Sequence, residues 1–179
     1  IDAAGDTALA RAFIDAVRDL MGRVGIPPTL EALKPNDIAA IAKQAVAEAY
    51  MAGLEARVKK GEAIGRIASV ASFFVSRIDA QIDKAIDARV KEGDAESEAL
   101  TALRGKVAIA NAKLAYAWYQ EMIASDRWQA LAAKGAMPQR LLWASTGVKD
   151  TAYPDTLYID TLIGPDTVNT MPPKTMDAF

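Results

Sequence analysis

The sequence has no cysteine and no histidine among its 179 residues. Their absence excludes disulfides, thiol nucleophiles, zinc sites with the usual ligands and every catalytic triad that uses histidine. Any catalysis must therefore use lysine, aspartate, glutamate, serine, threonine or tyrosine. The composition predicts no bound metal and no cofactor.

Long apolar runs and an excess of basic residues are also missing. No uncharged stretch reaches the roughly 20 apolar residues that a membrane-spanning helix needs, so we expect no membrane association. The net charge of −2 argues against nucleic acid as the main partner. No signal peptide is evident and the chain opens on Ile1 rather than methionine, which suggests a cytoplasmic protein and a fragment or processed chain.

One uncharged run organises the rest of the chain. Residues 67–76 are uncharged and mostly β-branched, aromatic or small, and Arg77 closes the run. Such a run is typical of a strand that is buried on both faces. The apolar residues that follow recur at every fourth position, which predicts a helix over residues 78–91. A strand that leads into a helix is one unit of a parallel sheet.

Two further strands are predicted, at residues 140–146 and 166–171, and helical patterns separate the strands. The longest helix is predicted over residues 95–124. Another helix is predicted over residues 35–60, and its apolar residues shift to a different face near Val46. Hydrophobic residues make up 51% of the chain, enough for one domain with a core. The predicted fold class is α/β and helix-rich, with about three parallel strands and an N-terminal helical segment.

Three aspartates, Asp79, Asp83 and Asp87, repeat along the helix predicted at residues 78–91. One interpretation is a metal site or an acid/base pair. The other is a solvent-exposed face beside the apolar stripe, with Lys84 and Lys91 as partners. We favour the exposed face, because charge series of this spacing are common on helix surfaces.

Small polar residues and cations follow the predicted strands. The polar residues are Ser72, Ser145, Thr146, Asn169 and Thr170, and the cations are Arg77 and Lys149. Ligands of parallel sheets bind at the carboxyl ends of the strands, where hydroxyls suit sugar oxygens and paired cations suit phosphate. The pattern indicates a site for a small phosphorylated polyol. The alternative, that the hydroxyls cap helices and the cations are solvated, stays open.

Five stretches of the chain resemble the C-terminal part of a bacterial transaldolase. They are residues 47–55, 68–77, 106–116, 141–147 and 163–173. The resemblance implies a partial (β/α)8-type barrel. It also implies the chemistry of that family, in which a lysine Schiff base transfers a dihydroxyacetone unit between sugar phosphates of the pentose phosphate pathway.

This resemblance assigns roles to four residues. Ser72 matches a serine that contacts the substrate, and Arg77 matches a phosphate-binding arginine. Lys149 falls near a second phosphate-binding cation, and Ser145 lies on the strand that leads to it. The strands that carry the family's Schiff-base lysine and its catalytic aspartate, glutamate and threonine have no counterpart here. No catalytic residue is therefore predicted, and whether the chain is an enzyme stays open.

Residues 6–46 resemble instead the helical C-terminal region of iron-dependent alcohol dehydrogenases. The match runs through residues 24–30 and 34–45. The metal ligands of that family lie upstream of this region, so neither iron nor nicotinamide binding is implied. The two resemblances meet near Val46 and predict a chimera, with a helical segment at residues 1–46 and a transaldolase-like partial barrel at residues 47–179.

Two functions are compatible with these features. The first is a non-catalytic recombinant or fragment that folds as a structural module and retains a sugar-phosphate half-site. The second is a transaldolase that is active only when the missing strands are supplied elsewhere. Because a three-stranded piece of a barrel leaves both edge strands unpaired, self-association is expected. The predicted partners are a sugar phosphate and other copies of the chain.

Overall fold

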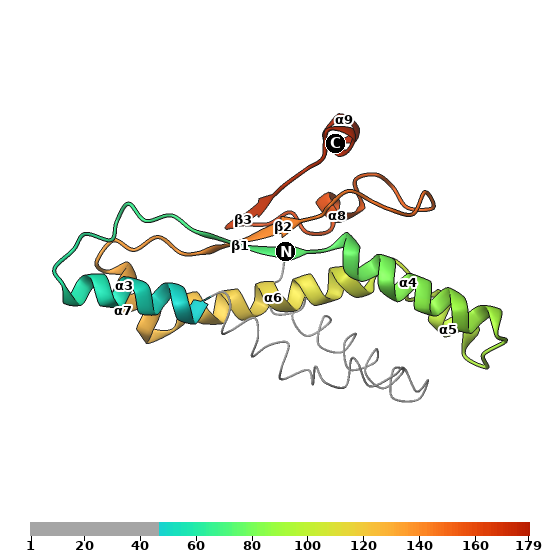
Figure 1. Cartoon of the computed structure of the whole chain (residues 1–179), viewed down its shortest axis with the longest axis horizontal. Coiled ribbons are helices and arrows are strands. Elements are labelled where there is room, and N and C mark those ends of the chain that lie inside the picture. The colour runs from blue at the N-terminus through green and yellow to red at the C-terminus, as the bar shows by residue number, and fades with distance from the viewer. Residues whose placement is uncertain (1–46) are drawn as a thin grey trace. The chain divides into compact units, whose positions relative to one another are not determined.

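The computed structural model describes residues 47–179 (Figure 1). Predictions for residues 1–46, including the N-terminal helical segment, lie outside the described residues. The predicted domain boundary at residue 46 also stays a prediction. No helix of the described part is long and apolar enough to cross a membrane. The helices are α3 (Ala49–Lys59), α4 (Ser76–Lys91), α5 (Ser97–Thr101), α6 (Val107–Ala124), α7 (Asp126–Ala132), α8 (Leu157–Asp160) and α9 (Pro173–Ala178), and the strands are β1 (Val70–Phe74), β2 (Arg140–Ala144) and β3 (Thr167–Asn169).

The three strands form one open parallel sheet in the order β1-β2-β3. The Val75 amide donates to the Ala144 carbonyl oxygen at 3.0 Å, at the end of the β1–β2 ladder. The Thr170 amide donates to the Trp143 carbonyl oxygen at 3.1 Å, where β3 ends. The predicted α/β class, with three parallel strands separated by helices, is confirmed.

Strand β1 is buried on one face only, which corrects the prediction of a strand buried on both faces. Ala71 is 8% exposed, and Val75, directly after the strand, is fully buried. Val70 and Phe74, which point to the other face, are 40% and 46% exposed. Ser72 lies on this exposed face, because side chains alternate along a strand. An uncharged composition is compatible with double burial but does not show whether a second layer is present.

The chain divides into two compact units. The described residues of the first unit are 72–114 and 142–179, and those of the second are 47–71 and 115–141. Each of β1, β2 and α6 runs from one unit into the other.

The first unit is organised around Trp143 in β2. Its ring meets the Phe73 ring edge-on, with 5.7 Å between centroids and an interplanar angle of 88°. Its indole N–H donates to the carbonyl oxygen of Leu162 at 3.0 Å. The Trp143 side chain, only 1% exposed, therefore has both a packing partner and a satisfied donor. In the same unit, α4 contacts α5 (Figure 1).

In the second unit, α3 contacts α7 (Figure 1). An ion pair joins them, with Arg127 Nε 2.6 Å from Glu55 Oε1. The Tyr50 hydroxyl lies 3.0 Å from the Ile67 carbonyl oxygen and 2.9 Å from the Met137 carbonyl oxygen. Through these two hydrogen bonds, Tyr50 connects α3 to the segments that precede β1 and β2.

The helix predicted over residues 95–124 is in fact two helices, α5 and α6. Gly105 lies in the turn between them with φ +68°, a left-handed conformation that ends helical geometry. A Cβ at this position would lie 2.8 Å from Tyr153 Cζ, so the site also requires glycine for space. The apolar spacing continues across the turn, which is why the pattern predicted a single helix.

Candidate functional site

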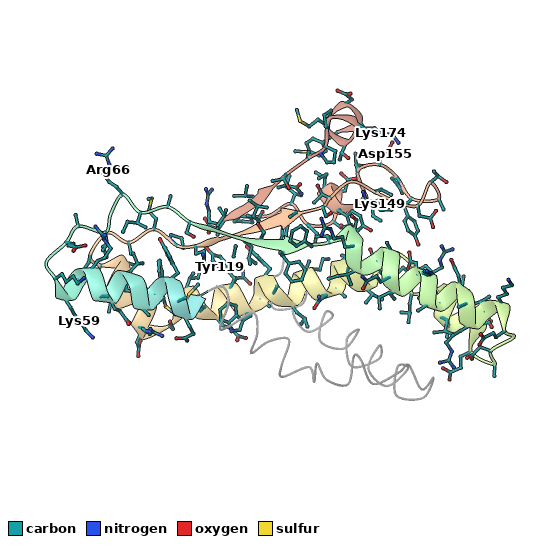
Figure 2. The ribbon with its side chains drawn as sticks, in the orientation of Figure 1. Lys59, Arg66, Tyr119, Lys149, Asp155 and Lys174 are labelled. Atoms are coloured by element: carbon teal, nitrogen blue, oxygen red, sulfur yellow. The ribbon has the colours of Figure 1, made fainter. Side chains whose placement is uncertain are left out.

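The four residues assigned to sugar-phosphate binding lie in the first unit, near the carboxyl ends of β1 and β2. Ser72 lies on the exposed face of β1, and Arg77 is the second residue of α4. Ser145 follows β2 directly, with φ 57°. Lys149 is exposed on the loop that follows (Figure 2). This is the sheet edge at which ligands of parallel α/β folds bind.

Arg77 is positioned by a cation–π contact. Its guanidinium carbon lies 4.5 Å from the centroid of the Phe74 ring. A guanidinium that stacks on an aromatic ring still presents its N–H groups in its own plane, where an anion can accept from them. The exposed Arg77 is therefore suited to hold a phosphate at the end of β1.

The backbone of Ser145 joins the end of β2 to the start of α4. Its carbonyl oxygen accepts from the Ser76 amide at 3.0 Å. The hydroxyl of Ser76 is buried and makes no hydrogen bond within the described residues. The contact brings the residue that follows β2 next to the first turn of α4, where Arg77 lies.

Thr146 has a structural role, although it caps no helix as the alternative interpretation expected. This residue is fully buried, and its hydroxyl lies 2.8 Å from the Thr170 carbonyl oxygen and 3.0 Å from Asn169 Oδ1. These contacts join the ends of β2 and β3. Of the strand-end polar side chains, those of Thr146 and Asn169 therefore pair with each other.

A groove of about 420 Å³ lies between α4 and the loop that carries Lys149. Its lining includes Ser76 and Asp79 from α4, and Lys149 and Tyr158 from the other side. Ser72, Arg77 and Ser145 are not among the lining residues. The structure therefore gives Lys149 different surroundings from those of the other three predicted site residues.

Asp79 is a buried acceptor on this groove, only 2% exposed. One carboxylate oxygen accepts from the Ala108 amide at 2.8 Å, and the other accepts from the Tyr158 hydroxyl at 2.8 Å. Burial raises the pKa of Asp79, although both hydrogen bonds favour its ionised form. Burial and the bond to Asp79 raise the pKa of Tyr158, so this hydroxyl stays a donor at neutral pH.

Asp83 repeats the arrangement one turn later on α4. It is 6% exposed and accepts from the Gly105 amide at 3.1 Å and from the Tyr153 hydroxyl at 2.8 Å. Burial, together with the bond to Asp83, raises the pKa of Tyr153. Asp83 thus joins α4 to the turn before α6 and to the loop after β2, and Asp79 joins α4 to α6 and to α8.

Arg104 adds a third attachment to the same loop. Its Nη2 lies 2.8 Å from Asp150 Oδ2, and its Nε lies 3.3 Å from Asp87 Oδ1. Asp150 directly follows Lys149 in the chain. The loop is therefore attached close to Lys149 as well as at Tyr153, and Tyr158 attaches α8, which follows it.

A fourth contact joins the loop to α9. Lys174 Nζ lies 2.9 Å from Asp155 Oδ1, and the two side chains meet in Figure 2. The Lys174 side chain is 80% exposed. A pair so open to solvent contributes little to stability, so the buried aspartates carry most of the attachment.

The interpretation of the aspartate series as a solvent-exposed face is wrong for Asp79 and Asp83, and only Asp87 is exposed. Within residues 47–179, no group of three or more acidic side chains is arranged to hold a metal ion. Hydropathy patterns treat a carboxylate as a surface group, and so they missed these two acceptors. The signal that could have found them is the pair of tyrosines, Tyr153 and Tyr158, shortly after the second strand.

The fold and site together define a parallel α/β domain of the barrel type, with polar and cationic residues at the strand ends. Residues 39–179 match the family model described as "Transaldolase/Fructose-6-phosphate aldolase". The chain belongs to this family.

Several curated proteins are similar to the chain. The transaldolase of Trichodesmium erythraeum is 61% identical over 132 residues, which are 73% of this chain and 35% of that protein. Transaldolase 2 of Nostoc sp. is 61% identical over 133 residues, with the same coverage. The transaldolase of Arthrobacter sp. is 45% identical over 192 residues, which are 99% of this chain and 50% of that protein.

Two conclusions follow from these coverages. The chain spans between about a third and a half of the length of these relatives. The similarity to the Arthrobacter protein extends through nearly the whole chain, including most of residues 6–46. The predicted alcohol dehydrogenase segment, and the chimera that depended on it, therefore receive no support.

Proposed function

We propose that this chain contributes the phosphate-binding part of a transaldolase-type sugar-phosphate site. Arg77 holds the phosphate with Ser72 and Ser145 beside the sugar, and Lys149 supplies a second cation from the loop after β2. The observation that carries the proposal is the exposed Arg77 guanidinium, stacked on Phe74 at the carboxyl end of β1. Family membership supports a sugar phosphate as the ligand, and we propose the cytoplasm, typical of transaldolases, as the compartment.

The Schiff-base step needs a lysine that this proposal does not assign to any residue of the chain. A lysine amine becomes nucleophilic at neutral pH only where a dry pocket or a neighbouring cation lowers its pKa. The resemblance to transaldolases puts that lysine on a strand that has no counterpart among residues 47–179. We therefore propose that these 179 residues bind a sugar phosphate without turnover, and that strands outside this sequence complete the activity.

Thermal unfolding with increasing inorganic phosphate or fructose 6-phosphate tests the proposal. A ligand at 100 times its Kd stabilises the folded state by about 2.7 kcal/mol, which raises Tm by several degrees. Arg77→Ala is expected to abolish this shift. Arg140→Ala is the matched control, because Arg140 is also exposed but lies at the amino end of its strand, β2. A shift that survives in Arg77→Ala contradicts the assignment.

The same preparation gives a second readout with borohydride and fructose 6-phosphate. Borohydride reduces a Schiff base to a stable adduct, which the mass of the intact protein reveals. Ligand binding without an adduct is the expected result. An adduct on any lysine of this chain would show that the chain supplies the nucleophile itself.

A second proposal is that the chain self-associates through its open sheet. The exposure of Val70 and Phe74 on one face of β1 supports it. In the described part of the chain, no strand lies beyond β1 or β3, and open edges of this kind pair with other strands. Light scattering at micromolar concentration is expected to give a dimer or larger species, and Phe74→Lys is expected to shift it toward the monomer. A strictly monomeric wild-type chain contradicts this proposal.

A further inference from the structure

We propose that Tyr153, in the loop after β2, and Tyr158, in α8 just beyond that loop, are positioning residues, which fix this segment to the buried aspartates of α4 and thereby hold Lys149 in place for an anion. The inference rests on the proposed function, since it takes Lys149 as a phosphate-binding residue. It adds two tyrosines and two aspartates, none of which was predicted to take part in the site.

Lys149 depends on its backbone for its position. The side chain is exposed and forms no ion pair with any residue in the described part of the chain. A free lysine side chain loses rotamer entropy when it binds an anion, so a mobile backbone would add a further entropic cost. If the loop is already fixed in the free protein, its backbone loses no further entropy when the anion binds.

The attachments are suited to this task because they are buried and complete. Asp79 and Asp83 each accept one backbone amide and one tyrosine hydroxyl, so both oxygens of each carboxylate are used. Hydrogen bonds to a buried carboxylate are stronger than those between neutral groups. The loop is therefore held by bonds that solvent does not readily replace.

Helix α4 links the two cations of the proposed site. It carries Arg77 in its first turn and the two aspartates on the face that holds the loop of Lys149. The same helix thus sets the position of the Arg77 backbone and carries the aspartates to which the loop of Lys149 is bonded. Loss of a tyrosine hydroxyl is expected to loosen Lys149 while leaving Arg77 stacked on Phe74.

Tyr153→Phe in the full chain, titrated with inorganic phosphate by calorimetry, tests the inference. Losing one hydrogen bond to the loop is expected to weaken phosphate binding about fivefold. Tyr50→Phe is the matched control: the same hydroxyl is removed in the second unit, so stability falls but phosphate affinity stays unchanged. Amide exchange of Ala152, whose N–H bonds Asp150 Oδ1 at 2.9 Å, is expected to accelerate in Tyr153→Phe only.

A double-mutant cycle with Lys149→Ala separates positioning from general stability. If Tyr153 acts through Lys149, Tyr153→Phe has no further effect on phosphate affinity once Lys149 is absent. An unchanged affinity in Tyr153→Phe, or an effect that persists in the Lys149→Ala background, overturns the inference and leaves the proposed function standing. A wild-type chain that binds no phosphate overturns the proposed function and, with it, this inference.

Discussion

Asp79→Ala is expected to lower the free energy of unfolding by about 3 kcal/mol, because two buried donors lose their acceptor. The Tyr158 hydroxyl and the Ala108 amide each bond a different oxygen of this carboxylate, and neither gains another partner from alanine. A buried unsatisfied donor costs about 1–3 kcal/mol, and relief of the buried charge offsets part of the sum. Urea unfolding at neutral pH measures the difference.

Asp87→Ala is the control for this prediction. Asp87 lies two turns further along the same helix, but its side chain is 57% exposed and its ion pair with Arg104 is long, at 3.3 Å. The same truncation there is expected to change the free energy of unfolding by no more than about 0.5 kcal/mol. Equal small losses at both positions would mean that Asp79 belongs to a solvated face after all.

The effect of Asp79→Ala should also depend on pH. Because burial raises the pKa of Asp79, the folded chain keeps a proton at pH values where the unfolded chain has released it. The stability that Asp79 contributes is therefore fully present below its unfolded pKa of about 3.9 and decreases as the pH rises through the folded pKa. We expect the difference in the free energy of unfolding between wild type and Asp79→Ala to become smaller as the pH rises through this range. Urea unfolding at a series of pH values measures it.

Gly105→Ala is expected to destabilise the chain by about 3 kcal/mol, from backbone strain and from overpacking together. The residue has φ +68°, and the new Cβ would lie 2.8 Å from Cζ and 3.1 Å from Cε1 of Tyr153. The ring cannot move aside freely, because its hydroxyl bonds Asp83 at 2.8 Å. The substitution therefore strains the turn and displaces the loop of Lys149.

Gly93→Ala isolates the contribution of the clash. Gly93 has a similar φ, +79°, but an added Cβ there meets no atom within 4 Å. Its substitution is expected to cost about 1 kcal/mol, from backbone conformation alone. In a Tyr153→Ala background the two glycine substitutions should cost the same, and a difference that remains would show that the Tyr153 ring is not what excludes a side chain at Gly105.

The fold class could be predicted from patterns along the chain. Segments with helical periodicity separate the apolar runs at residues 67–77 and 140–146. The strands β1 and β2 lie within these two runs. The patterns failed where local composition does not report tertiary surroundings. The apolar spacing continues through Gly105, so the turn between α5 and α6 was missed, and β1 has one exposed face despite its uncharged composition.

The candidate site could be predicted only in part. Arg77 and Lys149 were predicted as site residues because they follow strands of a parallel sheet, whose carboxyl ends meet at one end of the sheet, and their role stays a prediction. The attachments of Lys149 could not be found in this way. Asp83 and Tyr153 are 70 positions apart, and no periodicity along either segment reports that they meet.

By itself, the sequence determined which fold class forms and which cations follow the strands. These properties depend on composition and on spacing within short segments, where side-chain direction repeats with each element. Only the tertiary structure decided that Asp79 and Asp83 are buried acceptors rather than surface charges. The reason is that burial depends on what packs against a side chain, and here the bonding groups come from two segments that are distant along the chain, residues 105–108 and residues 153–158.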